Sequence, residues 1–148
     1  MKDIKKIMVP VDFSEQTDPI IQSAEMIAKK FEATIHVVFV VESLAAYAGF
    51  AIPHPHLDTL EKDLLVRAER KMTEFLGDFL DPRTPHTSVI LRGNVAAELA
   101  GYAKQEGIDL IIIGTRNCKA IEKTLFGSVT ERVIKTAPCP VLSMNPCI

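Results

Sequence analysis

Residues 111–144 of the chain read IIIGTRNCKAIEKTLFGSVTERVIKTAPCPVLSM. The order of residue types predicts a buried strand, a glycine turn, a basic loop, a second glycine turn, a helix and a closing strand. Ser128 and Glu131 have the spacing of a capping box, which predicts that the helix begins at Ser128. Gly127, just before it, would permit a backbone turn that a Cβ would hinder.

A helix N-terminus beside a glycine turn is a place where α/β proteins bind anions, because backbone N–H groups are free there and the helix dipole is positive. The sequence therefore suits a phosphate site around Gly114, Gly127 and Ser128. The alternative is an ordinary strand–helix junction, in which the glycines and the cap serve the fold alone.

The composition is that of a globular protein with one domain over residues 1–148, with 47% hydrophobic and 24% charged residues. A net charge of −2 predicts no general attraction to nucleic acid or to an anionic membrane. No apolar run approaches the roughly 20 residues that span a bilayer, and residues 1–13 do not have the pattern of a signal peptide. Cys118, Cys139 and Cys147 lack paired or metal-ligand spacing, which favours a reducing cytoplasm.

Apolar runs and apolar stripes alternate along the whole chain. Strands are predicted at residues 7–11, 33–41, 87–91, 110–113 and 141–144, and helical stripes at 20–31, 57–79, 95–103 and 129–137, where Val129, Val133 and Ala137 would face the core. Asn94 is the expected N-cap and Gly107 the expected end of the third helix. Residues 42–55 are predicted to form a long loop. This alternation predicts a doubly wound α/β sheet with right-handed crossovers.

In such sheets ligands bind outside the C-terminal ends of the strands. Here those ends carry Asp12, Glu42, Gly93 and Gly114. His54 and His56 alternate with prolines, but no further ligand pattern accompanies them, so we predict no metal site. The motifs of nucleophilic catalysis and the lysine of a Walker loop are missing from the sequence, which leaves any enzymatic role undecided.

Four segments together resemble the universal stress protein family: VPVDFSE at 9–15, RGNVAAEL at 92–99, DLIIIG at 109–114 and GSVTERVIKTAPCPVL at 127–142. The resemblance covers essentially the whole chain. It implies a five-stranded parallel sheet of order 3-2-1-4-5 with helices on both faces, the adenine nucleotide alpha hydrolase-like fold. It also implies a role in stress response or nucleotide-dependent signalling.

One branch of that family binds ATP through a motif of three spaced glycines, the last followed by serine or threonine. Gly114 and Gly127–Ser128 match its first and last positions, whereas the middle position is Asn117. If the middle glycine serves a positive φ, Asn is the best replacement and the loop keeps its shape. If it serves close approach to phosphates, the Asn117 side chain intrudes on the ligand.

The resemblance also assigns residues to the remaining parts of the ligand. Arg116 and Lys119 would offer positive charge to phosphates, or else be solvated surface charges. Asp12 would accept hydrogen bonds from ribose, or else cap the first helix. Val11 and Val40 would line the adenine pocket, unless they are ordinary core residues, and Pro10 would belong to the same binding site. Backbone N–H groups of the 114–119 loop and of Gly127, Ser128 and Val129 would bind phosphate.

We therefore expect a protein that binds ATP, with or without Mg²⁺, and hydrolyses it slowly at most. The alternative is a nucleotide-free dimeric interaction module of the same family; a flavoprotein is disfavoured because no aromatic pair is placed to sandwich a flavin ring. The resemblance further implies a homodimer through the apolar C-terminal strand Val141–Met144, whose edge would otherwise be exposed.

Overall fold

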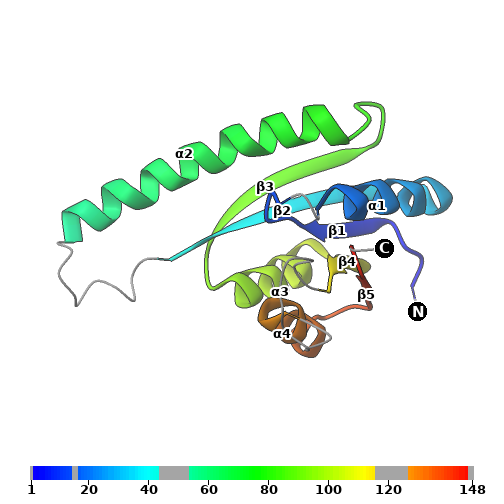
Figure 1. Ribbon diagram of the computed structural model, residues 1–148. Coiled ribbons are helices and arrows are strands. Elements are labelled where there is room, and N and C mark those ends of the chain that lie inside the picture. Colours follow the sequence, from blue (N-terminus) through cyan, green and yellow to red (C-terminus); the bar gives the residue numbers. More distant parts are fainter. Residues whose placement is uncertain (1, 15–16, 44–53, 116–126, 147–148) are drawn as a thin grey trace.

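The fold is a five-stranded parallel sheet of order β3-β2-β1-β4-β5, as expected (Figure 1). The computed structural model describes residues 2–14, 17–43, 54–115 and 127–146. The strands are β1 (Lys6–Pro10), β2 (Thr34–Glu42), β3 (His86–Gly93), β4 (Leu110–Gly114) and β5 (Val141–Met144). β5 is an edge strand, in keeping with the two prolines that precede it.

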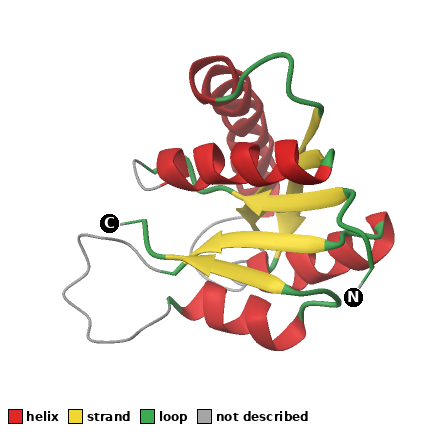
Figure 2. Ribbon diagram, turned by 90° about the vertical axis from the view of Figure 1, so that its right-hand side faces the viewer, coloured by secondary structure: helices red, strands yellow, loops and turns green. Residues whose placement is uncertain are grey.

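Helices cover both faces of the sheet (Figure 2). They are α1 (Thr17–Phe31), α2 (His54–Phe79), α3 (Val95–Glu106) and α4 (Ser128–Thr136). α1 and α2 lie on one face and α3 and α4 on the other, and the N-terminal part of α2 extends past the strands (Figure 1). No helix within the described ranges has the length and apolarity that crossing a membrane requires.

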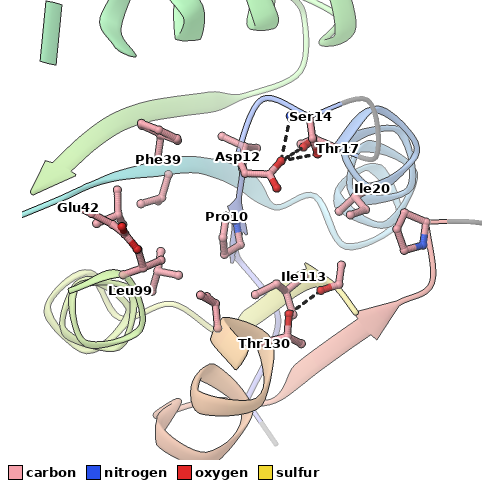
Figure 3. Close-up of a pocket in the computed structure, with 17 residues that line it drawn as sticks. Pro10, Asp12, Ser14, Thr17, Ile20, Phe39, Glu42, Leu99, Ile113 and Thr130 are labelled. Carbon is pink, nitrogen blue, oxygen red and sulfur yellow. Dashed lines mark hydrogen bonds between the residues drawn. The ribbon is translucent and has the colours of Figure 1, made fainter. Parts of the chain in front are cut away.

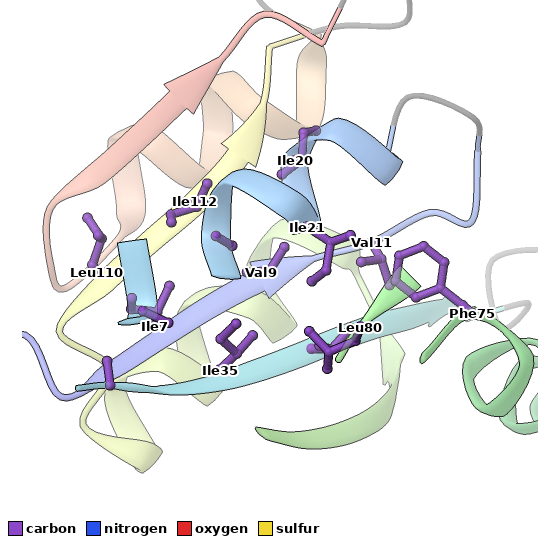
Figure 4. Close-up of a cluster of buried hydrophobic side chains, with 14 of the residues drawn as sticks. Ile7, Val9, Val11, Ile20, Ile21, Ile35, Phe75, Leu80, Leu110 and Ile112 are labelled. Carbon is purple, nitrogen blue, oxygen red and sulfur yellow. The ribbon is translucent and has the colours of Figure 1, made fainter. Parts of the chain in front are cut away.

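The central strand β1 supplies side chains to two separate core layers. Ile7 and Val9 pack under α1 and α2 (Figure 4), whereas Met8 between them packs under α3 and α4. All three side chains are fully buried. This burial on both faces explains why the strands are nearly continuous apolar runs rather than alternating ones.

Two predicted boundaries of the middle elements are wrong. Arg92 and Gly93 belong to β3 rather than to a turn, because they continue the ladder opposite Val41 and Glu42 of β2. The predicted loop 42–55 is too long at both ends, since Glu42 closes β2 and α2 begins at His54. A proline in the first turn of a helix costs no backbone hydrogen bond, so Pro55 does not exclude the helix there.

The predicted ends of α3 are confirmed. The Asn94 side chain accepts a hydrogen bond from the Ala97 N–H at 3.1 Å, as an N-cap does. Gly107 closes the helix in the left-handed conformation, with φ 65°. These caps fix the entry into α3 from the end of β3, and so place the first turn of α3 at the C-terminal edge of the sheet.

The predicted capping box of α4 is wrong, although the helix does begin at Ser128. Gly127 is the N-cap, because its carbonyl accepts the first helical hydrogen bond from the Glu131 N–H at 3.0 Å. No side-chain hydrogen bond from the N-cap residue Gly127 caps the helix. The Glu131 carboxylate instead accepts a hydrogen bond at 2.8 Å from Nζ of Lys135, four residues further along the helix. Val129 is not a core residue either: it is 37% exposed, whereas Val133 is fully buried.

Candidate nucleotide site

A cavity of about 370 Å³ opens at the C-terminal ends of β1, β2 and β4 (Figure 3). This is the edge where the strand order reverses, and where ligands of doubly wound folds bind. The lining residues come from six parts of the chain: Pro10, Val11, Asp12, Ser14, Thr17, Ile20, Val38, Phe39, Val40, Glu42, Val95, Leu99, Ile113, Gly114, Val129, Thr130 and Pro146.

Most of the cavity wall is apolar. Val40 of β2, Leu99 of α3 and Ile113 of β4 are all buried residues that reach the cavity from three different elements. Pro10 lies between these walls and the Asp12 turn in Figure 3. An apolar slot with a few polar groups at its ends suits a planar ring system carrying a polar substituent.

The polar end above β1 is a tight turn around Asp12. Its Oδ1 accepts hydrogen bonds from the Ser14 N–H at 2.9 Å, the Ser14 hydroxyl at 2.6 Å and the Thr17 hydroxyl at 2.8 Å (Figure 3). Asp12 therefore organises the turn that leads into α1, while its side chain still lines the cavity. The two predicted roles of Asp12, holding the helix entry and facing a ligand, are compatible in this geometry.

The charge of Asp12 is stabilised by the same hydrogen bonds. Desolvation in the cavity acts to raise the pKa of Asp12, but the hydrogen bonds from Ser14 and Thr17 together outweigh it and lower the pKa below the usual value. The group is therefore an ionised hydrogen-bond acceptor at neutral pH.

The opposite end of the cavity is the junction of β4 and α4. The Thr130 hydroxyl donates to the Gly114 carbonyl at 2.7 Å, and the Gly127 N–H donates to the Thr115 carbonyl at 2.7 Å. These hydrogen bonds fix the first turn of α4 to the end of β4. Because the Gly127 N–H is engaged, it is not a free donor for an anion.

The N–H groups of the first turn of α4 are the remaining candidate donors to an anion. No residue of the described ranges accepts a hydrogen bond from the backbone N–H of Ser128, Val129 or Thr130. They are the orphan donors of a helix start, at the positive end of its dipole, and Val129 and Thr130 line the cavity. The cavity thus has a carboxylate at one end and an electropositive helix N-terminus at the other.

The two motif glycines, Gly114 and Gly127, differ in their surroundings. A Cβ on Gly114 would lie 2.6 Å from Ile20 Cδ1, so a side chain there would require the end of the Ile20 side chain on α1 to move away from β4. Gly127 has φ −66° and ψ 162°, which any residue adopts, and among the described residues a Cβ there would meet only the Thr115 carbonyl at 3.7 Å. The prediction that Gly127 is needed for its backbone conformation is therefore wrong.

Six of the predicted site residues line this one cavity: Pro10, Val11, Asp12, Val40, Gly114 and Val129. Gly127 and Ser128 lie beside it at the start of α4. Arg116, Asn117 and Lys119 lie outside the described residues. Their assignment to a ligand stays a prediction.

Sequence reasoning missed the partners that complete the site, above all Thr17, Ile20 and Thr130. The spacing from Asp12 to Ser14 is that of an Asx turn and could have indicated the local hydrogen bond. The contact of Thr130 with Gly114 joins residues sixteen apart and has no comparable signal. Among the residues that the structure describes, no group of three or more His, Cys, Asp or Glu side chains is placed to hold a metal ion.

Comparison with known proteins identifies one family. A model of the universal stress protein family matches residues 3–144. Universal stress protein MJ0531 of Methanocaldococcus jannaschii is 34% identical over 145 residues, which cover 93% of this chain and 80% of that protein. The solved structure of the hypothetical protein MJ0577 superposes with a TM-score of 0.82 at 26% identity, covering 97% of each chain.

Two more distant solved structures are nucleotide complexes. One is a universal stress protein in complex with cAMP, with a TM-score of 0.63, 19% identity and coverage of 98% and 99% of the two chains. The other is the universal stress protein from Archaeoglobus fulgidus in complex with dAMP, with a TM-score of 0.68, 17% identity and coverage of 96% and 98%. At these sequence identities the likeness shows a shared fold and nothing beyond it.

Proposed function

This chain belongs to the universal stress protein family, and we propose that it binds an adenine nucleotide, ATP in the first place, in the cavity between Asp12 and α4. The observation that carries the proposal is the cavity itself, with apolar walls, a carboxylate at one end and, at the other, helix N–H groups that donate to no residue of the described ranges. Nucleotides have the same three-part chemistry of flat base, hydroxyl-bearing sugar and anionic phosphate. Its cellular role would be nucleotide-dependent signalling or stress response.

The charges at the two ends set the orientation of the ligand. An ionised Asp12 repels phosphate, so the phosphates lie toward Ser128, Val129 and Thr130, where the dipole of α4 is favourable. The base then lies against Val40, Leu99 and Ile113, and the ribose lies near Asp12. The cAMP and dAMP complexes of relatives support an adenine nucleotide as the class of ligand.

Mg²⁺ would enter with the nucleotide. Magnesium is commonly held by substrate phosphates and water with few protein ligands, which agrees with the lack of a metal-binding cluster in the described part of the chain. The described residues around the cavity include no histidine, cysteine or lysine, so we propose binding rather than rapid turnover as the primary activity.

Isothermal titration tests the proposal with ATP, ADP, AMP and adenosine, each with and without Mg²⁺. We expect saturable binding of ATP, and Asp12→Ala should weaken it about 10-fold, as loss of hydrogen bonds to a charged group does. Asp78→Ala on the exposed surface of α2 is the matched control and should leave the affinity unchanged. No binding of any of the four ligands at millimolar concentration would overturn the proposal.

We also propose that the protein forms a homodimer through β5. Leu142 of this edge strand is 39% exposed, and Ile134 of the adjacent helix α4 is 41% exposed. An uncovered edge with an apolar side chain pairs readily with a second copy. Light scattering should give twice the chain mass, and Leu142→Lys should halve it, whereas Met26→Lys on α1 should not. A wild-type monomer at micromolar concentration would refute the dimer.

A further inference from the structure

The carboxylate of Asp12 is held through one of its two oxygens. Oδ1 accepts three hydrogen bonds, from the Ser14 N–H, the Ser14 hydroxyl and the Thr17 hydroxyl, at 2.9, 2.6 and 2.8 Å. No other residue in the described ranges donates to Oδ2. With respect to the described residues, the acceptor capacity of Oδ2 is therefore open to the cavity that Asp12 lines (Figure 3).

The turn that makes these hydrogen bonds contains one residue, Phe13, in an unfavourable backbone conformation. Phe13, between Asp12 and Ser14, has φ 61°, a left-handed conformation that is uncommon for an aromatic residue. Its ring packs on Phe39 at 4.6 Å and on Phe75 at 5.9 Å between centroids, which holds the strained backbone in place. Such strain beside a cavity is a mark of a preorganised functional group.

Thr17 is more than a surface neighbour of this turn. It is 3% exposed at the start of α1, and its own N–H donates to the Ser14 carbonyl at 3.0 Å. Its hydroxyl thus reaches Asp12 from a fixed point of a helix. A hydroxyl so placed removes the rotational freedom of the carboxylate.

We propose that Thr17 and Ser14 are positioning residues, which fix Asp12 so that Oδ2 accepts a hydrogen bond from a ribose hydroxyl of the bound nucleotide. This inference rests on the proposed nucleotide site. An ionised carboxylate can only accept, so it needs a donor in the ligand, and the ribose hydroxyls supply one whereas phosphate does not. The turn therefore sets a preference for ribonucleotides over deoxyribonucleotides.

The test measures dissociation constants of AMP, 2′-deoxy-AMP and 3′-deoxy-AMP for the full chain and three variants. The wild type should prefer AMP over at least one deoxy analogue by about 10-fold, the loss expected for one hydrogen bond to a charged group. Thr17→Val, which removes the hydroxyl at nearly constant shape, should weaken AMP about 5- to 10-fold and that analogue by less than about 2-fold. The sugar preference should collapse.

Two variants separate positioning from damage to the fold. Thr17→Ser keeps the hydroxyl and should restore the preference. Ser23→Ala removes a hydroxyl of the same helix that donates to the Pro19 carbonyl instead, and should leave the preference as in the wild type. If Thr17→Val does not fold, Ser14→Ala replaces it, because it removes one hydroxyl bond to Asp12 while the Ser14 N–H stays.

The outcomes distinguish this inference from the proposed function. A variant without the hydroxyl that keeps the wild-type sugar preference, or that weakens all three ligands equally, overturns the positioning role and leaves the nucleotide site standing. Inosine monophosphate is measured as a fourth ligand. If it binds more weakly than AMP while both deoxy analogues bind as tightly as AMP, the contact is with the base, and the inference is overturned. A wild type that binds none of the ligands overturns the proposed function, and this inference with it.

Discussion

The end of the Ile20 side chain on α1 packs directly over Gly114 at the end of β4, where a Cβ would lie 2.6 Å from Ile20 Cδ1. The glycine of the motif therefore matches the present packing of a helix on a strand, and no unusual φ is involved. This contact forms one wall of the cavity, which both residues line.

Relief of this contact should show as coupling between two substitutions. Gly114→Ala should lower the free energy of unfolding by about 1 kcal/mol, the low end of overpacking, because only the end of the Ile20 side chain must move. Ile20→Val should lower it by about 0.5–1.5 kcal/mol through a lost methylene. The double variant should lose less than the sum, because the shorter side chain makes room for the new Cβ. Urea denaturation of the four proteins measures the cycle, and strictly additive losses would contradict the contact.

Gly127→Ala should separate folding from ligand binding. Alanine lowers the conformational entropy of the unfolded chain and so stabilises the fold at this ordinary φ, but it is a poorer N-cap than glycine. The two effects nearly cancel, and stability should change by less than about 0.5 kcal/mol. Affinity for ATP should fall, because the added methyl group lies where phosphate approaches α4. Thermal denaturation with and without ATP reports both quantities, and an unchanged ligand-induced shift would show that no ligand comes close to Gly127.

The N–H of Ser128, which donates to no residue that the structure describes, can be deleted without breaking α4. Proline is well tolerated at the first helical position, and Gly127 before it already has the extended conformation that a following proline requires. Ser128→Pro should therefore leave the fold intact and weaken ATP more than adenosine, because only ATP carries phosphates. Ser128→Ala removes the hydroxyl, keeps the N–H and should bind ATP nearly as the wild type does. Equal affinities of the proline and alanine variants for ATP would exclude a phosphate contact at this amide.

His36 should make stability depend on pH. It is 7% exposed, and its Nδ1 lies 2.9 Å from the Tyr102 hydroxyl. Burial, with a smaller contribution from Lys6 and an opposing one from Glu106, lowers the pKa of His36. Because the unfolded chain then binds the proton more readily, the stability due to neutral His36 is present above the ordinary pKa near 6.5 and is lost as the pH falls through the lower folded value.

The measurement is the difference in unfolding free energy between wild type and His36→Gln at pH 7.5 and at pH 5. We expect the wild type to lose more stability on acidification, by at most about 1.4 kcal/mol per pH unit for one proton. Carboxylates that titrate in both proteins cancel in this difference. A parallel fall of the two curves would exclude His36 as the source.

The strands and the order of elements were predictable because burial on both sheet faces leaves an unmistakable apolar run, as in residues 110–113. The strand order did not follow from periodicity and came from the family resemblance. The capping box failed because a serine followed by glutamate three residues on occurs equally when serine is the first helical residue, and here Glu131 pairs with Lys135. Val129 shares the helical stripe of Val133, but the helix begins past the core, at the cavity.

The site residues at the strand ends were predictable from the sequence, whereas those brought together by helix packing were not. Asp12 and Gly114 stand at strand ends, which the alternation of elements locates. Ile20, Leu99 and Thr130 reach the cavity from three helices, and their convergence depends on how each helix packs across the sheet. Sequence periodicity gives the buried face of a helix but not which buried residue meets a gap in the core.

The cavity draws its walls from β1, β2 and β4 together, and β1 is the innermost strand of the sheet. If any one of these three strands is unfolded, the cavity is incomplete and the ligand has no site to bind. Binding of a nucleotide should therefore be linked to global unfolding rather than to local fluctuation. It should slow hydrogen exchange of the β1 amides by the same factor by which it raises the ratio of folded to unfolded protein.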